Sequence, residues 1–243
     1  MKPYRASHQS TIKAGWYENI VYGPLSYDSY MWEEEKKILD LELRFLLKKN
    51  SNPHYLDFAC GTGRVIGHLE RRVAESVGVD ISEEMLDGAR LKLAHSEIIR
   101  GDLTRADMLP GREFDLVTAF RFFLNAEPEL REESLLVLAR KLADGGALIF
   151  NIHGNTWSFR FVMVLWYRFI KGRRLNHLSY WKVKKLLERY GFAIERLYGI
   201  GVVPKPLYRF LPRFIFRVID GLWTLIPSSK YFSYNLIFVC TRA

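Results

Sequence analysis

The sequence predicts an α/β fold: a doubly wound, mostly parallel sheet of seven strands. Six short apolar segments alternate with helical segments, and a seventh apolar segment closes the chain. The apolar segments are 55–59, 76–80, 97–100, 114–119, 147–151, 192–197 and 235–240. Strands that alternate with helices pair in parallel and carry helices on both faces of the sheet. A chain of 243 residues is long enough to bury one such core together with an appendage.

Helical periodicity fills the intervals between the apolar segments. The intervals are 64–73, 83–94, 128–143 and 179–190. Ser82, which precedes Glu83 and Glu84, suits a helix start, because a hydroxyl caps a backbone N–H and acids favour the positive end of the dipole. Ser179 opens the last interval in the same way. Another helix is expected at about 33–49, before the first strand.

These elements predict an N-terminal helical cap over residues 1–52 and one domain over residues 53–243. A proline-containing insertion at about 200–233 interrupts the alternation before the last strand. Its prolines are Pro204, Pro206, Pro212 and Pro227.

The bulk composition is that of a globular protein of a reducing compartment. Hydrophobic residues make up 49% of the chain, and the two cysteines are too few for a disulfide framework. The first residues lack the apolar stretch of a signal peptide. The longest apolar run, 161–167, falls short of the roughly 20 residues that span a bilayer. A cytoplasmic protein is therefore expected.

Positive charge is concentrated in the last third of the chain. Residues 157–243 contain 16 Lys and Arg against 3 Asp and Glu, whereas residues 1–156 contain 20 against 24. The same third holds 20 of the 35 aromatic residues. Such a segment favours an anionic partner, although a solvated basic surface is the alternative.

The strongest motif is a glycine turn between a strand and a helix. Gly61 and Gly63 follow the apolar segment 55–59 and allow the backbone to bend sharply and approach a ligand closely. Asp80 ends the next apolar segment, nineteen residues after Gly61. A carboxylate at this place can accept hydrogen bonds from both hydroxyls of a ribose. The order of strand, turn, helix, strand and acid thus predicts a nucleotide-like ligand.

From about residue 55 to residue 150, these features resemble the Rossmann-like class I methyltransferases, which use S-adenosylmethionine. The resemblance implies that Asp57, Ala59, Gly61 and Gly63 lie against the methionyl part of that cofactor. The family often has glycine where this chain has Ala59, and alanine is a frequent replacement there.

The same resemblance assigns the rest of the cofactor site. Asp80 is implied to bind the ribose, with Ile81 beside the adenine. Asp102, followed by Leu103, is implied to face the adenine amine. Phe120, at the end of the fourth strand, would line the cofactor.

Acceptor-side candidates follow the fourth and fifth strands. His153 is the best-placed general base, because its ordinary pKa of about 6.5 suits proton removal near neutral pH. Arg121 and Asn125 are candidates for orienting an anionic or hydroxylated acceptor, and Tyr22 and Tyr27 for a lid. The alternatives are loop ordering by His153, a salt bridge of Arg121, helix capping by Asn125 and ordinary packing of the two rings.

Two segments, 157–174 and 206–226, are both basic and aromatic. They allow three interpretations: helices at a membrane interface, a lid over an apolar substrate, or helices of the core. In the second segment Arg209, Arg213 and Arg217 recur every four residues and would form one cationic stripe on a helix. We therefore predict an anionic, small-molecule or lipid-linked acceptor and contact of both segments with an acidic membrane surface. A peripheral location on the inner face of the membrane would follow.

The predicted function is methylation of a hydroxyl on a glycan-, polyketide- or quinone-like acceptor. RNA methylation is a second candidate, disfavoured because no RNA-binding module is recognisable. An NAD-dependent oxidoreductase would need a third glycine where Ile66 stands. A non-catalytic cofactor-binding protein is the fourth candidate. The histidines show no metal-ligand spacing, so no metal is predicted, and the sequence leaves the oligomeric state open.

Overall fold

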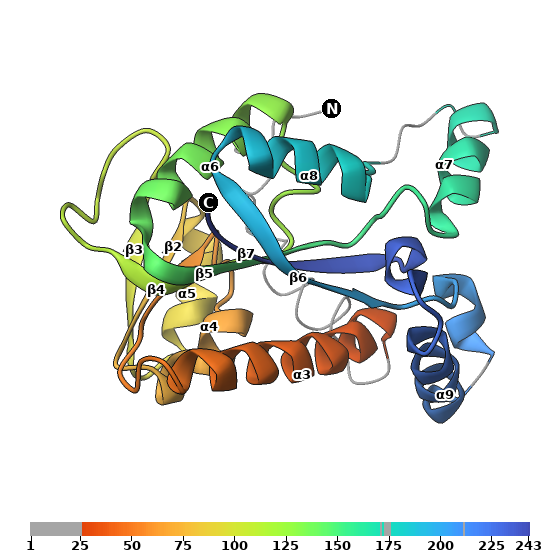
Figure 1. Ribbon diagram of the computed structural model, residues 1–243, viewed down its shortest axis with the longest axis horizontal. Coiled ribbons are helices and arrows are strands. Elements are labelled where there is room, and N and C mark those ends of the chain that lie inside the picture. The colour runs from red at the N-terminus through yellow and green to blue at the C-terminus, as the bar shows by residue number, and fades with distance from the viewer. Residues whose placement is uncertain (1–25, 171, 173–175, 211) are drawn as a thin grey trace.

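The structure, a computed structural model, describes residues 26–170, 172, 176–210 and 212–243. Its centre is one seven-stranded sheet in the order β3-β2-β1-β4-β5-β7-β6 (Figure 1). All neighbouring strands pair in parallel except β7, which runs antiparallel to β5 and to β6. The strands are β1 (His54–Phe58), β2 (Glu75–Asp80), β3 (Ser96–Arg100), β4 (Phe114–Ala119), β5 (Leu142–Ile152), β6 (Phe192–Ile200) and β7 (Asn235–Arg242). The predicted doubly wound, mostly parallel sheet is confirmed.

Helices cover both faces of this sheet (Figure 1). They are α3 (Tyr27–Leu47), α4 (Arg64–Leu69), α5 (Glu83–Arg90), α6 (Pro128–Lys141), α7 (Arg160–Phe169), α8 (Tyr180–Arg189) and α9 (Arg213–Thr224). Short 3₁₀ helices add η2 (Glu70–Arg72), η3 (Lys205–Arg209) and η4 (Ser229–Phe232). The predicted caps form, because the hydroxyls of Ser82 and Ser179 accept hydrogen bonds from the N–H groups of Met85 and Lys182.

Two apolar clusters hold the layers together. On one face, α6 and α8 pack on the sheet through residues such as Leu138 and Leu187. On the other face, α3 and α4 pack on it through residues such as Leu39, Leu43 and Ile66. Helix α3 therefore shares a core with the sheet, and burial of these side chains stabilises both.

Helix α3 begins at Tyr27, earlier than the position near residue 33 that periodicity predicts. The hydroxyl of Ser26 caps it by accepting the N–H of Ser29 at 3.0 Å. The first turns carry Tyr27, Tyr30 and Met31, which form a third cluster with the C-terminal insertion. This contact explains the extra turns, because the apolar face of the helix continues onto a partner that is distant in the sequence.

The two basic segments form separate helices, α7 and α9. Arg209 belongs to η3, so the predicted stripe of three arginines on one helix is wrong. Pro212 has an extended ψ of 149°, which separates η3 from α9 and leaves Arg213 and Arg217 on the same helix. Among the described residues, no helix combines the length and the apolar character needed to cross a bilayer.

Candidate active site

The turn after β1 bends through left-handed backbone. Ala59, Gly61 and Gly63 have φ values of 57°, 56° and 75°. A Cβ on Gly61 would meet no atom within 4 Å, so this part of the turn borders open space. A Cβ on Gly63 would lie 2.9 Å from Leu93 Cδ1 and 3.1 Å from Ala89 Cβ. Glycine is thus favoured at position 61 by the positive φ, and at position 63 by the positive φ and by close packing of the turn.

Asp80 ties the end of β2 to this turn. One carboxylate oxygen accepts the N–H of Gly61 at 2.9 Å, and the other accepts the N–H of Ser82 at 2.9 Å. Each carboxylate oxygen has lone pairs for two hydrogen bonds, so the same group can also serve a ligand hydroxyl. The Asp80 carboxylate therefore stabilises the glycine turn and can bind a ligand at the same time.

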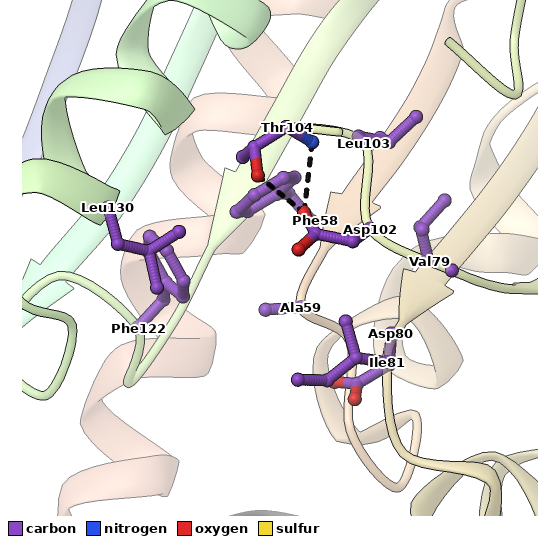
Figure 2. A pocket seen from close by; sticks show the side chains of 11 residues that line it. Phe58, Ala59, Val79, Asp80, Ile81, Asp102, Leu103, Thr104, Phe122 and Leu130 are labelled. Atoms are coloured by element: carbon purple, nitrogen blue, oxygen red, sulfur yellow. Dashed lines mark hydrogen bonds between the residues drawn. The ribbon is translucent and has the colours of Figure 1, made fainter. Parts of the chain in front are cut away.

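Two adjoining hollows lie beside the turn at the carboxyl ends of β1, β2 and β4, and they share Ala59 and Asp80. The first encloses about 440 Å³ of solvent-open space and has mostly apolar walls. Figure 2 shows Phe122 and Leu130 on one side of it and Ile81 on the other. Its lining residues are Phe58, Ala59, Val79, Asp80, Ile81, Gly101, Asp102, Leu103, Thr104, Phe122 and Leu130.

Asp102 lies at the edge of this first hollow and is held by the loop after β3. Its carboxylate accepts the N–H of Thr104 at 3.0 Å and the hydroxyl of Thr104 at 2.6 Å (Figure 2). An apolar slot with the fixed carboxylate of Asp102 at its edge suits a flat, nitrogen-rich ring such as adenine.

The second hollow encloses about 640 Å³ of solvent-open space and is more polar. Its lining residues are Asp57, Ala59, Cys60, Gly61, Thr62, Arg64, Val65, Asp80, Met85, Phe120, Arg121 and Asn125. Two arginines in one wall, together with Asp57 and Asp80, suit a zwitterionic group that carries a carboxylate and an ammonium.

A buried carboxylate from α3 orients the two arginines of the second hollow. The side chain of Glu35 is fully buried and lies 3.3 Å from Arg64 Nη1 and 3.5 Å from Arg121 Nη2. It also accepts hydrogen bonds from the amides of Asn151 at 2.9 Å and Asn235 at 2.7 Å. Glu35 thus ties the first described helix to β5, β7 and the cofactor-side turn.

Asp57 is buried beneath the glycine turn. Its carboxylate accepts the hydroxyl of Thr118 at 2.6 Å and the N–H of Ile66 at 3.2 Å. Burial raises the pKa of Asp57 to about 7, although both hydrogen bonds act in the opposite direction. The carboxyl group is therefore protonated in the folded protein at pH values where it is ionised in the unfolded chain.

This raised pKa predicts a pH-dependent stability. Because the unfolded pKa is about 3.9, stability is lost as the pH rises toward 7 and stays constant above it. We expect the wild-type protein to lose about 3 kcal/mol of unfolding free energy relative to Asp57→Asn between about pH 5 and about pH 8. Urea unfolding of both proteins across this range measures the difference. Parallel stability curves would contradict the assignment.

His153 directly follows β5. Its Nδ1 is buried and has no hydrogen-bond partner among the residues that the structure describes. Burial and the positive charges of Arg121 and Arg160 lower the pKa of His153 well below its ordinary value. The imidazole is therefore neutral at physiological pH and can accept a proton, but its lowered pKa makes it a weaker base than an ordinary histidine.

The structure brings most of the predicted cofactor residues together. Asp57, Ala59, Gly61, Asp80, Ile81, Asp102, Leu103 and Phe120 all line the two hollows. Gly63 does not line them and instead packs on Leu93 as the N-cap of α4. Which of these residues contact a ligand stays a prediction.

The acceptor-side candidates are divided between two places. Arg121 and Asn125 line the second hollow, and the Asn125 amide donates to the Arg121 carbonyl at 2.8 Å. His153 lies outside the walls of both hollows. Tyr27 is 4% exposed and packs on Tyr208 and Tyr234, away from these walls. Tyr22 lies outside the described residues.

Sequence reasoning missed two contributors to the second hollow. Arg64 lines it and stacks on the Trp32 ring, with 4.2 Å between the guanidinium carbon and the ring centroid. Glu35 orients Arg64 and Arg121 from beneath. Arg64 was detectable as the first residue after the glycine turn, whereas nothing separates Glu35 from its neighbours Glu33 and Glu34 in the sequence.

The sheet order and the glycine turn agree with a class I methyltransferase fold, and the paired hollows lie where the cofactor site of that fold is predicted. Residues 56–146 match a family model described as a methyltransferase domain. The predicted methyltransferase domain is thereby confirmed over residues 56–146. Within the described residues, no group of His, Cys, Asp and Glu is arranged to hold a metal ion.

Relatives and solved structures agree with this domain. A dTDP-3-amino-3,4,6-trideoxy-alpha-D-glucopyranose N,N-dimethyltransferase of Streptomyces venezuelae is 36% identical over 64 residues, which is 26% of each chain. An uncharacterized methyltransferase of Anoxybacillus flavithermus is 27% identical over 131 residues, 51% of this chain and 61% of the relative. The chain thus spans less than two thirds of the length of these relatives.

The fold extends further than the sequence similarity. The crystal structure of the magnesium protoporphyrin IX methyltransferase ChlM of Synechocystis PCC 6803, with bound S-adenosylhomocysteine (SAH), has a TM-score of 0.64. It is 18% identical, and the match covers 96% of this chain and 99% of that one. The described part of the chain, including the strands and helices of its C-terminal third, therefore adopts the fold of this structure.

Proposed function

We propose that this protein transfers a methyl group from S-adenosylmethionine to a hydroxyl of a small, anionic acceptor, which is lipid-linked in its native form. The observation that carries the proposal is the pair of hollows that share Asp80 beside the glycine turn. One hollow suits the adenine and the other suits the methionyl group. The residues present therefore fit the cofactor.

Three side chains would hold the cofactor. Asp80 would accept hydrogen bonds from the ribose hydroxyls while keeping the turn in place through Gly61. Asp102 would accept from the adenine amine, and Arg121 would face the cofactor carboxylate. When bound, the cofactor supplies an electrophilic methyl group on a sulfonium. The protein then has to hold and align the acceptor, exclude water and remove a proton.

Proton removal is the role that we propose for His153. Its neutral imidazole follows β5 and lies in the positive field of Arg121 and Arg160. The same field would attract an anionic acceptor toward the histidine. An oxygen acceptor is supported by this base, since a hydroxyl must lose its proton during transfer. Methylation of an amine, which the name of the Streptomyces relative states for that protein, is the second candidate.

We expect His153→Gln to lower methyl transfer by about a hundredfold or more, because a positioned general base contributes about 10²–10⁴-fold. The assay follows tritiated methyl groups from labelled S-adenosylmethionine into a lipid and quinone extract of the source cells. SAH affinity of the variant should stay within about twofold of wild type, since His153 lies outside both hollows. Transfer at the wild-type rate would remove the base role, and no transfer by the wild type would remove the proposed acceptor class.

A further inference from the structure

Helix α7 presents an apolar face to solvent. None of its ten residues, Arg160–Phe169, is buried. The exposed fractions are 51% for Phe161, 68% for Val162, 38% for Leu165 and 74% for Phe169. These positions recur at helical spacing, so they lie on one side of the helix. Burial in the core, one of the three interpretations of this segment, is therefore wrong for α7.

Helix α9 repeats this arrangement. Phe216 is its one buried residue and anchors the helix against Tyr30 and Tyr208. The opposite side carries Phe214, Val218 and Leu222, which are four residues apart and 65%, 56% and 60% exposed. Exposed apolar residues continue beyond both ends of the helix at Leu207, Phe210, Leu225 and Ile226. Apolar surface of this extent marks an interaction site.

Both helices lie at the same end of the molecule, on either side of the segment that leads into β7 (Figure 1). Each is tied to the body by polar contacts. Arg160 of α7 donates to the Tyr234 hydroxyl at 3.0 Å and to the Asn176 carbonyl at 2.8 Å. Asp220 of α9 accepts from the Tyr30 hydroxyl at 2.8 Å. The exposed faces are therefore held in place by the fold.

The charge around these faces is positive. Helix α7 contains no acidic residue, and Arg168 is exposed next to Phe169. Helix α9 contains one acidic residue, Asp220, whose carboxylate turns inward to Tyr30 and Val202. Arg217, beside Val218, is 56% exposed, and its Nε lies 3.9 Å from a carboxylate oxygen of Glu34 on α3. The surface thus combines large apolar side chains with cations and lacks outward-facing acids on the two helices.

We propose that the exposed faces of α7 and α9 dock the protein on a lipid surface rich in anionic headgroups. Amphipathic helices with Trp, Phe and Leu on one face and Arg nearby bind at this boundary, where apolar side chains enter the acyl region and cations pair with headgroups. A protein partner is disfavoured because it would have to match two separate convex helices. A second copy is disfavoured because two such positive faces repel each other. The docking does not depend on methyl transfer, and it would bring the protein to the surface that holds the lipid-linked acceptor of the proposed function.

Vesicle flotation of the full-length protein tests the docking. We expect the protein to float with vesicles of phosphatidylcholine and phosphatidylglycerol, and to bind vesicles of phosphatidylcholine alone about tenfold more weakly. Added salt should reduce the difference in binding between the two vesicle types, because it screens the attraction between the cationic side chains and the anionic headgroups. Equal binding to both vesicle types, or binding to neither, would overturn the proposal.

Variants assign the binding to the two helices. Phe161→Ser with Phe169→Ser on α7, and Phe214→Ser with Leu222→Ser on α9, should each weaken anionic-vesicle binding about tenfold or more. The matched control is Leu91→Ser with Leu136→Ser, two leucines that are 89% and 53% exposed elsewhere on the surface and should have no effect. If the helix variants bind vesicles like the control, or if they instead dissociate a dimer in light scattering, the proposal is wrong.

Calorimetry with SAH on the same samples separates this proposal from the proposed function. The four substituted residues on α7 and α9 lie outside the cofactor hollows, so the variants should bind SAH like the wild type. Vesicle binding without SAH binding would refute the proposed function and leave the docking intact. The reverse result would refute the docking alone.

Discussion

Replacing Glu35 with Ala should lower the free energy of unfolding by about 3–5 kcal/mol, the effect of removing one partner from a buried ionic network. The fully buried Glu35 carboxylate accepts from Asn151 and Asn235 and lies within 3.5 Å of Arg64 and Arg121. Without it, two amide groups and two largely buried guanidinium groups would lose a shared acceptor. Urea denaturation measures the loss.

The matched control for this prediction is Glu33→Ala, two residues earlier in the same helix. The Glu33 side chain is 44% exposed and pairs with Lys36 at 2.9 Å on the surface. Exposed pairs of this kind contribute about 0–1 kcal/mol. The Glu35→Gln variant, which retains one acceptor oxygen, should fall between the two. A Glu35→Ala protein as stable as Glu33→Ala would contradict the network.

Replacing Asp80 with Ala should weaken SAH binding by about a hundredfold or more. Two charge-assisted hydrogen bonds to a ribose are worth about 1.5 kcal/mol or more each, and their sum corresponds to that factor. The variant also releases the N–H groups of Gly61 and Ser82, so the turn itself loses its tether. Isothermal titration calorimetry gives the affinity.

Two further variants show whether the effect belongs to the ribose contact. Asp80→Asn retains an acceptor oxygen for the turn but lacks the charge, so we expect an intermediate loss of affinity. Asp87→Ala removes a carboxylate whose side chain is 67% exposed on α5 and should leave SAH binding unchanged. If Asp80→Ala bound SAH within about twofold of wild type, the cofactor would not be gripped as we describe.

Local sequence patterns were sufficient to predict the strands of the sheet and the glycine turn after the first strand. The seven apolar segments correspond to the seven strands, because each is short and bounded by turn or cap residues. Asp57, Gly61 and Asp80 could be placed because strand, turn and acid follow one another at fixed spacing. Strand β5 starts earlier than predicted, at Leu142. Phe114 of β4 pairs with Leu142 and Leu116 pairs with Ala147, so a register shift between these two pairs takes up the intervening residues of β5.

Contacts between distant segments could not be predicted in this way. Glu35 meets Asn151 and Asn235, which are more than a hundred residues away in the sequence. Its burial follows from how α3 lies against β5 and β7, and a run of three glutamates gives no hint of it. The apolar periodicity of α7 could equally mean core, lid or membrane helix, because periodicity shows that a face is apolar and not what covers it.

We infer that the bend at Gly61 and the carboxylate of Asp80 bind an adenosyl sulfonium cofactor. Calorimetric titration of the wild-type protein with SAH, and separately with NAD, tests it most directly. We expect saturable binding of SAH, with one site per chain, and no heat of binding from NAD. Binding of NAD, or the absence of SAH binding by folded protein, would contradict it.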